Sequence, residues 1–337
     1  MRARTTIALV LAAIALAAVG VPASTERLIL GMVLPRNTMW HKVITEMTDD
    51  WRRGTEGRVT VLVRDSAGEE RTIVQRMRND VFQAGALSAI GLTDIDRGFD
   101  VFGIPMFFDS HAELYHVVRA LTPRFEERLE QRGFVLLGWG HVGWVQVFST
   151  RPVRTVDDLK SVRLFTSNGD DEMVEWYKRH GFRPQALSVA DVPMALQTKM
   201  LEAVPTTPLA ALSFQWYGTA RHMLRIGIAP LVGATVVTRK AWDRIGADDR
   251  TTLLAAARRM QDRLEIEVPR QDEQAVVAMQ KRGLEVIAPE GAAAAEWRRA
   301  AEEFAESMRG SRVEPALFDE AVRARATFRE SRRGSRS

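Results

Sequence analysis

Apolar side chains recur along this chain in two periods, one typical of strands and the other of helices. Residues 25–33 alternate apolar and polar side chains, as a half-buried strand does. From Trp40 to Trp51 the apolar side chains stand three or four positions apart, which predicts one buried helix face. A valine-rich segment at 58–64 and a small apolar segment at 84–92 predict two more strands. Strands and helices that alternate in this way predict an α/β fold.

The strand–loop–helix unit occurs twice between residues 157 and 212. A short strand at 162–165 runs into a loop and a helix. A second strand at 202–204 runs into Pro205-Thr206-Thr207-Pro208 and another short helix. Ligands of open α/β sheets bind outside the carboxyl ends of the strands. We therefore expect a ligand-binding surface at residues 165–169 and 205–208.

The length of 337 residues, with 46% hydrophobic content, favours two domains over one. We expect lobe I to comprise residues 24–149 and about 230–268, and lobe II to comprise residues 150–229 and about 269–322. The chain should cross between the lobes near 148–151 and again near 228–234. A long periodic segment at 247–283 should bridge the two lobes, and Pro269 should kink or divide this helix.

The amino-terminal residues 1–23 have the features of a secretory signal. Arg2 and Arg4 precede an apolar run at 7–19 that is too short to span a bilayer comfortably, and Val21-Pro22-Ala23 supplies small residues for a peptidase. We predict export to the periplasm with cleavage near Ala23, and an uncleaved anchor is the alternative. The chain has no cysteine, which excludes disulfides, thiolate metal sites and a lipidated cysteine.

The formal net charge of +4 gives little indication of a nucleic-acid partner, because the basic surplus lies mainly at the carboxyl end. Residues 323–337 contain six arginines and one glutamate. We expect this segment to be a disordered, solvated tail. A docking or membrane-surface segment is the alternative.

Catalytic and metal-binding motifs are missing from the sequence. There is no G-x-S-x-G and no phosphate loop, and residues 138–143 match G-x-G-x-x-G without its strand–turn–helix context. His111 and His116 lie five positions apart, which does not fit the i, i+4 spacing of a helical zinc pair. We therefore expect neither an enzyme nor a cofactor or metal site, and a soluble binder of small molecules fits best.

Four segments carry a resemblance to a known family. They are Leu34-Pro35 through Lys42, FGIPMFF at 102–108, RPVRTVDDLK at 151–160 and ALQT at 195–198. Between about Arg27 and Gly283 the chain resembles the solute-binding proteins of TRAP (tripartite ATP-independent periplasmic) transporters, the dicarboxylate-binding-protein family. The resemblance implies a two-lobed periplasmic binding protein fold, each lobe an open mixed sheet flanked by helices. It also implies delivery of a small-molecule ligand to the small and large subunits of a membrane permease.

The chain departs from this family at the ligand-binding positions. The resemblance implies an arginine that grips a substrate carboxylate in the strand after D-L-K, and Phe165 stands there. Arg163 lies two positions earlier and should share the strand face. A second family arginine is replaced at about Val145, and the usual amide is replaced by Thr206 or Thr207. The chain therefore resembles a divergent branch that lacks the carboxylate-binding arginine.

These departures favour a hydrophobic or lipid-like ligand, because an apolar pocket rewards buried area at about 25 cal/mol per Å². The alternatives are an organic acid held by Arg36 or Arg163, a neutral solute such as a sugar, and a stand-alone envelope protein that handles lipids or senses a ligand. Several candidates have a competing structural role: the tryptophans as core, and the threonines as caps of the helix that follows. The candidate ligand-binding residues are Phe165, Thr206, Thr207, Trp139, Trp144, Arg36, Asn37, Phe107, Arg163 and Trp216.

Overall fold

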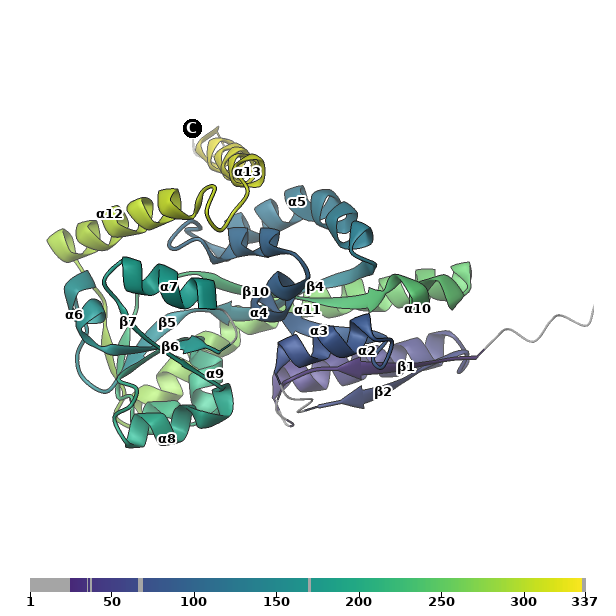
Figure 1. Cartoon of the computed structure of the whole chain (residues 1–337), viewed down its shortest axis with the longest axis horizontal. Coiled ribbons are helices and arrows are strands. Elements are labelled where there is room, and N and C mark those ends of the chain that lie inside the picture. The colour runs from purple at the N-terminus through teal and green to yellow at the C-terminus, as the bar shows by residue number, and fades with distance from the viewer. Residues whose placement is uncertain (1–24, 35, 37, 66–68, 169–170, 335–337) are drawn as a thin grey trace, which may run out of the picture.

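A computed structural model describes residues 25–34, 36, 38–65, 69–168 and 171–334 of the chain. Its strands form two sheets, each flanked by helices (Figure 1). The first sheet has the strand order β2-β1-β3-β10-β4, and the second has the order β11-β9-β5-β8-β6-β7. The α/β, two-lobed fold expected from the sequence is therefore confirmed. The candidate signal peptide, residues 1–23, lies outside the described residues.

Lobe I is built on the five-stranded sheet. Its strands are β1 (Glu26–Gly31), β2 (Val59–Arg64), β3 (Ala84–Ser88), β4 (Phe134–Trp144) and β10 (Pro230–Thr238). Strand β1 pairs in parallel with β2 and β3, whereas β10 runs antiparallel to β3 and β4. The helices of this lobe are α2 (Met39–Gly54), α3 (Glu70–Arg78), α4 (Ala89–Ile95), η2 (Arg97–Gly103), α5 (His111–Gln131) and α10 (Arg239–Arg244).

Lobe II is built on the six-stranded sheet. Its strands are β5 (Gln146–Ser149), β6 (Arg163–Ser167), β7 (Arg183–Leu187), β8 (Ala203–Thr206), β9 (His222–Leu224) and β11 (Glu285–Ile287). Its helices are α6 (Val156–Ser161), α7 (Asp171–Arg179), η3 (Val189–Asp191), α8 (Val192–Gln197), α9 (Pro208–Ser213), η4 (Trp216–Gly218) and α12 (Gly291–Met308). Strand β6 is parallel to both β7 and β8, so these three carboxyl ends share one edge.

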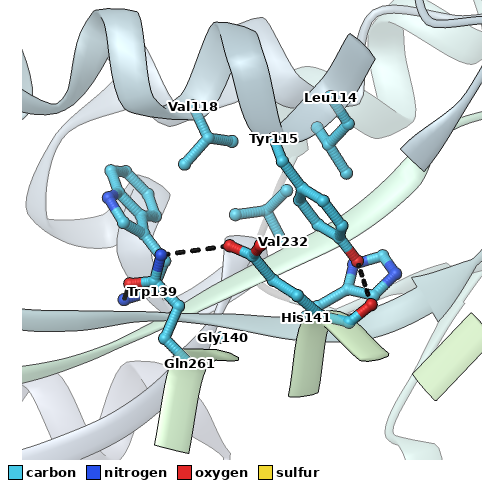
Figure 2. Close-up of a pocket in the computed structure, with 9 residues that line it drawn as sticks. Leu114, Tyr115, Val118, Trp139, Gly140, His141, Val232 and Gln261 are labelled. Carbon is cyan, nitrogen blue, oxygen red and sulfur yellow. Dashed lines mark hydrogen bonds between the residues drawn. The ribbon is translucent and has the colours of Figure 1, made fainter. Parts of the chain in front are cut away.

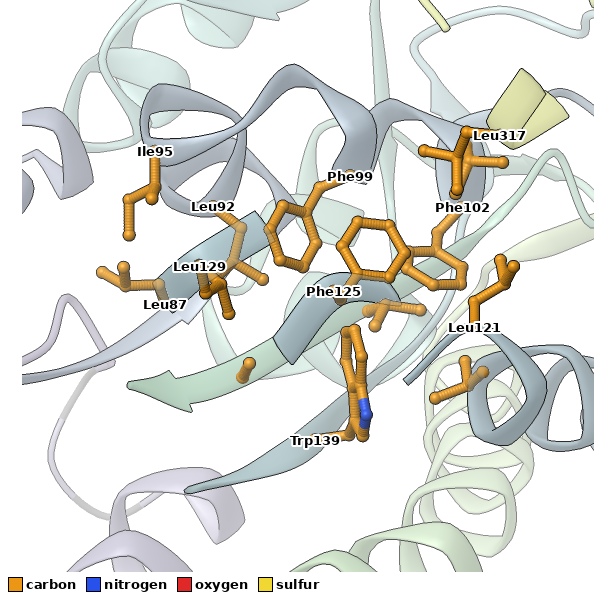
Figure 3. Close-up of a cluster of buried hydrophobic side chains, with 14 of the residues drawn as sticks. Leu87, Leu92, Ile95, Phe99, Phe102, Leu121, Phe125, Leu129, Trp139 and Leu317 are labelled. Atoms are coloured by element: carbon orange, nitrogen blue, oxygen red, sulfur yellow. The ribbon is translucent and has the colours of Figure 1, made fainter. Parts of the chain in front are cut away.

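An aromatic cluster forms part of the core of lobe I (Figure 3). Phe99 and Phe102 from η2 pack on Phe125 of α5, and Trp139 of β4 packs on all three rings. The indole N–H of Trp139 donates to the Thr122 hydroxyl at 2.9 Å, so the one polar atom of this ring is satisfied. Aromatic pairs of this kind add about 0.5–1.5 kcal/mol each beyond the area that they bury.

The chain passes between the lobes at two adjacent strands. Strand β4 leads through Val145 directly into β5, and β9 returns through residues 225–229 into β10. The two passages are bonded to each other, because Val145 N–H donates to Ala229 O at 2.8 Å and Ile228 N–H donates to Val145 O at 2.9 Å. We call these residues, Val145 and 225–229, the crossing ladder. The first crossing thus comes a few residues before the expected 148–151, because β5 pairs with β8 in the second sheet from Gln146 onward.

Helix α11 (Ala247–Gln280) runs along both lobes without a break. Leu264 and Val268 pack in a lobe I cluster, and Val276 and Met279 pack in a lobe II cluster. Pro269 therefore does not divide the helix, contrary to one of the two outcomes expected for it.

The carboxyl-terminal helix α13 (Pro315–Gly334) returns from α12 to lobe I and packs on α5 (Figure 1). Leu317 and Phe318 are buried in the lobe I cluster, and the Arg329 guanidinium bonds to the Glu113 carboxylate. The expectation of a disordered tail is therefore wrong for 323–334, because Arg329 pairs with Glu113 of α5 and Arg325 bonds to the Phe107 carbonyl. Residues 335–337 lie outside the described range. No helix in the described part of the chain combines the length and apolar character that a bilayer span requires.

Candidate functional site

Phe165 lies near the carboxyl end of β6, on the face of the strand that is only partly buried. Along β6 the side chains of Leu164 and Thr166 are buried, while Arg163, Phe165 and Ser167 alternate with them and are partly exposed. The sequence-based placement of Arg163 and Phe165 on one face is confirmed. Phe165 packs against the lobe II cluster.

Helix α9 and the residue that follows it, Phe214, carry apolar side chains that reach both lobes. Leu209 and Phe214 pack against the lobe II cluster that Phe165 also contacts. They pack as well against a lobe I cluster, which Leu34, after strand β1, also contacts. Leu34 follows β1, Phe165 belongs to β6, and Leu209 follows β8, while Phe214 packs on the same clusters from the end of α9. These four side chains, here called the apolar strand-end group, are only partly buried.

A charged group follows strands β1 and β2 on lobe I. The Arg36 guanidinium bonds to both oxygens of Asp65, through Nε to one and through Nη2 to the other at 3.2 Å. His41 Nε2 lies 3.6 Å from the same carboxylate. The hydrogen bond from Arg36 holds the pKa of Asp65 below its usual range. The Arg36 side chain is 77% exposed, so it remains accessible to a ligand.

Arg163, the other candidate cation, lies at the opposite end of β6 from the expected ligand edge. Its Nε donates to the Lys199 carbonyl at 2.8 Å, and its Nη2 lies 3.3 Å from the Glu202 carboxylate. Both partners belong to the segment that leads into β8. Arg163 therefore ties two strands together and does not reach the carboxyl edge.

The two candidate threonines have different roles. Thr207 is fully buried, and its hydroxyl accepts the Ala210 N–H at 3.3 Å, so it caps α9. Thr206 is the last residue of β8 and stays partly exposed. Of the two hydroxyls, only that of Thr206 is available at the strand ends.

The five aromatic candidates do not form one pocket. Phe107 and Trp139 are core residues of the lobe I cluster, and Trp144 packs against it. Trp216 is buried in the lobe II cluster, where it stacks on Phe214 at 4.9 Å between ring centroids. The expectation for Phe107, Trp139 and Trp216 is thus corrected, because α5, α13 and α9 cover these rings. Asn37 lies outside the described residues.

A small cavity lies under α5, beside strands β4 and β10 (Figure 2). Leu114, Tyr115, Trp139 and His141 are among its lining residues, and its volume of about 10 Å³ has room for about one water molecule. Burial, and then His111 nearby, lower the pKa of His141 to about 3, so this imidazole is neutral. Neither ring nitrogen of His141 has a hydrogen-bond partner in the described part of the chain. No group of three metal-ligating side chains occurs among the described residues either.

Sequence reasoning missed Asp272, a buried carboxylate on α11. Its two oxygens accept the backbone N–H groups of Trp144 at 3.1 Å and Leu209 at 3.0 Å. A signal was present, because Leu264, Val268 and Asp272 follow one another at a spacing of four residues. That spacing places an acid on the buried stripe of the helix.

A family model for bacterial extracellular solute-binding proteins, family 7 (DctP), matches residues 30–310. The C4-dicarboxylate-binding periplasmic protein DctP of Rhodobacter capsulatus is 23% identical over 188 residues, 56% of each protein. The chain spans about 56–60% of the length of the first curated relatives that it matches.

Two solved structures show the same fold. A TRAP periplasmic solute-binding protein of Ralstonia eutropha with bound (S)-2-acetolactate has a TM-score of 0.82 and 20% identity, over 89% of this chain and 99% of that one. DctP6, a Bordetella pertussis extracytoplasmic solute receptor that binds pyroglutamic acid, has a TM-score of 0.81 and 15% identity, with the same coverage.

Proposed function

Because this chain belongs to the bacterial extracellular solute-binding proteins of family 7, we propose that it binds a small organic acid and delivers it to a two-subunit TRAP-type permease. The family consists of extracytoplasmic solute receptors, which are not enzymes. Cleavage of the signal near Ala23 and release into the periplasm belong to this proposal, and amino-terminal sequencing of the exported protein tests them. Small-molecule binding needs no nucleic acid, and contact with the membrane would come through the permease alone.

The exposed guanidinium of Arg36 is the observation that supports the organic-acid assignment. It is an exposed cation just beyond β1, and Asp65 bonds to its Nε and Nη2. A guanidinium has five N–H donors, so Nη1 remains able to bond to a carboxylate of the ligand. Such a charge-assisted bond contributes about 1.5–3 kcal/mol, which is about tenfold to a hundredfold in affinity.

The comparisons do not support the hydrophobic or lipid-like ligand that the sequence favours. The Ralstonia eutropha and Bordetella pertussis proteins were solved with, or described as binding, small acids. One observation still favours an apolar portion in the ligand: Phe165 stands in the apolar strand-end group, where the family resemblance implies an arginine. We therefore propose an acid with an apolar body, whose carboxylate contacts Arg36 and whose body packs on Phe165, while Thr206 supplies a hydroxyl.

Binding assays on the wild type, two variants and one control variant test this assignment. Small organic acids, with pyroglutamic acid as the first probe, should raise the Tm of the wild type. Arg36→Gln should raise the Kd for the best acid about tenfold or more. Phe165→Arg should lower the Kd for small, polar acids. It should raise the Kd for apolar ligands, because an unpaired cation in an apolar site is costly.

Arg244→Gln is the matched control for Arg36. Arg244 also pairs with an acid of lobe I, but its partner Glu26 begins β1, at the far end of the strand from Arg36. This control should leave the Kd unchanged. If fatty acids or other apolar molecules raise the Tm while no small acid does, the organic-acid assignment fails. Adjacent permease genes would favour transport over a stand-alone lipid-handling or sensing role.

A further inference from the structure

Asp272 joins three elements at the boundary between the lobes. It lies on α11 just after Pro269, where the helix passes from the lobe I cluster to the lobe II cluster (Figure 1). Its Oδ2 accepts the N–H of Trp144, the last residue of β4 and the neighbour of the crossing ladder. Its Oδ1 accepts the N–H of Leu209, in the first turn of α9. One carboxylate thereby holds the end of a lobe I strand and the start of a lobe II helix.

The backbone around this carboxylate is shaped to let it approach. Gly143 has a φ of +135°, and a Cβ atom there would lie 2.6 Å from Asp272 Oδ2 and 2.8 Å from Thr207 Cβ. Both distances are too short for any side chain, so glycine is required at this position. The Asp272 side chain is only slightly exposed, with a relative accessibility of 7% for the residue. Strand β4, the cap residue Thr207 and Asp272 are thus closely packed into one joint.

We propose that Asp272 is a positioning residue for ligand binding: its carboxylate fixes the start of α9, and with it Thr206 and Leu209, against the end of β4. This inference rests on the proposed function only in that Thr206 and Leu209 are taken to face the ligand. The positioning itself is a property of the free protein. A loosened joint would let Thr206 and Leu209 shift relative to the end of β4 and to Leu34, which weakens binding without removing any ligand contact.

The charges around Asp272 determine how pH acts on the joint. Burial raises the pKa of Asp272 to about 7, and the charge of Glu273 on the same helix acts in the same direction. The two backbone hydrogen bonds lower the pKa but do not outweigh burial. From α5, burial lowers the pKa of His111 and raises that of Tyr115, so both side chains are neutral near pH 7, and from β4 His141 is neutral as well. The residues of α9 carry no titratable side chain. No ion pair of Asp272 with a lysine or arginine occurs within the described ranges.

Ligand affinity and stability should therefore depend on pH in opposite directions. An ionised carboxylate accepts both N–H groups, whereas a protonated one places an O–H on one of the two oxygens. The joint tightens, and affinity rises, as pH increases through 7. The pKa of Asp272 is higher in the folded state than its usual value, so its contribution to stability is full below about pH 4 and is lost as pH rises through 7.

Titration calorimetry with pyroglutamic acid between pH 5.5 and 8.5 tests the inference. Wild-type Kd should fall about tenfold from pH 6 to pH 8 while the Tm declines. Asp272→Asn presents an N–H₂ in place of one oxygen, so its Kd should stay at the weaker, low-pH value throughout the range. Asp272→Glu should restore part of the pH dependence. Asp262→Asn, an exposed acid on the same helix, should behave as wild type.

Hydrogen exchange of the free protein supplies a measurement that needs no ligand. In wild type the Trp144 and Leu209 amides should exchange slowly, and Asp272→Asn should accelerate both at least tenfold while β1 and β3 keep their protection. Unchanged protection at both amides overturns the inference, whatever the protein binds. Equal Kd values and equal pH slopes for wild type and Asp272→Asn also overturn it. If wild type binds no acid but the two amides respond, the positioning stands and the organic-acid assignment fails.

Discussion

Asp96 pairs with Arg128 of α5 and with Arg132, which follows α5, through a single buried carboxylate. Its oxygens accept from Arg128 Nε and Nη2, both at 2.8 Å, and Arg132 lies 3.0 Å away. Asp96 also accepts the Gly98 N–H at 2.7 Å, which starts η2 below the aromatic cluster. Burial opposes ionisation of Asp96, but the bonds from Arg128 and Gly98 outweigh it and lower its pKa.

Asp96→Asn should destabilise the protein by about 3 kcal/mol, since it leaves two arginines beside an uncharged amide. Because the folded pKa lies below the unfolded one, Asp96 stabilises the fold above pH 4, and this contribution is lost as pH falls through the folded value. Thermal unfolding at pH 7 should show a Tm lower by about 5 °C, and the difference should shrink toward pH 3. A constant difference between pH 7 and pH 3 would contradict this account.

Single residues could be predicted from the sequence where alternation or capping determines their surroundings. The shared face of Arg163 and Phe165 follows from the period of a strand, and capping was the stated alternative for Thr207. Trp139 shows the limit of such reasoning. Strand period gives the face of the sheet on which a side chain lies, but it does not reveal that α5 covers that face. Asp272 binds N–H groups more than sixty residues away in sequence, and no local pattern contains that information.

The composition of helix α13 predicts a disordered tail, but its packing against lobe I makes it a docked helix. Arg325 lies over the Phe107 ring, 3.9 Å from its centroid, and donates to the Phe107 carbonyl at 2.8 Å. Arg329 bonds to Glu113, whose side chain is almost fully buried. The net charge of this segment alone predicts a solvated tail. Because its arginines have partners and its apolar side chains are buried, the segment forms a docked helix instead.

Phe318→Ala should weaken this docking by about 3 kcal/mol, because it opens a cavity where α13 meets Phe107. Trypsin should leave Arg325 and Arg329 uncut in native wild type and should cut both readily in the variant, as mass spectrometry of timed digests would reveal. Glu330→Ala, at an exposed position of the same helix, is the control and should digest like wild type. Rapid cleavage at Arg325 in wild type would indicate that the helix is not docked in solution.

Periodicity predicts where most helices and strands lie, but it does not always predict the residues at which they begin and end. Helix α5 spans His111–Gln131, and the Ser110 hydroxyl accepts the Glu113 N–H as its cap. Strand β4 continues to Trp144, only two residues before β5 begins in the other sheet. A strand that leaves one sheet and enters another keeps its period, so the pattern does not mark the crossing.

The two lobes are joined by the crossing ladder, by α11 and by the segment between α12 and α13. The ladder is a single pair of strands: Val145 bonds to Ile228 and Ala229 through the backbone, and the Gln146 side chain accepts the Gly227 N–H at 2.9 Å. An ion pair between Arg97 of η2 and Glu172 of α7 also links the lobes. Rotation about the ladder can change the distance between the strand ends of the two sheets.

Ligand binding should therefore make the molecule more compact. Small-angle scattering should give a smaller radius of gyration with a saturating acid than without it. Glycerol at the same concentration serves as the control and should change nothing. If the profile at saturation superimposes on that of the free protein, the ligand does not close the lobes.

The position of β10 in its sheet determines when lobe I can be completed during synthesis of the chain. Strand β10 lies between β3 and β4, so β4 has no bond to the rest of its sheet until residues 230–238 exist. Helix α13 then covers the same lobe with the last part of the chain that the structure describes. As synthesis proceeds from the amino terminus, the first lobe to begin is the last to be completed. A nascent chain with no finished domain stays unfolded for longer, which would suit the export to the periplasm proposed above.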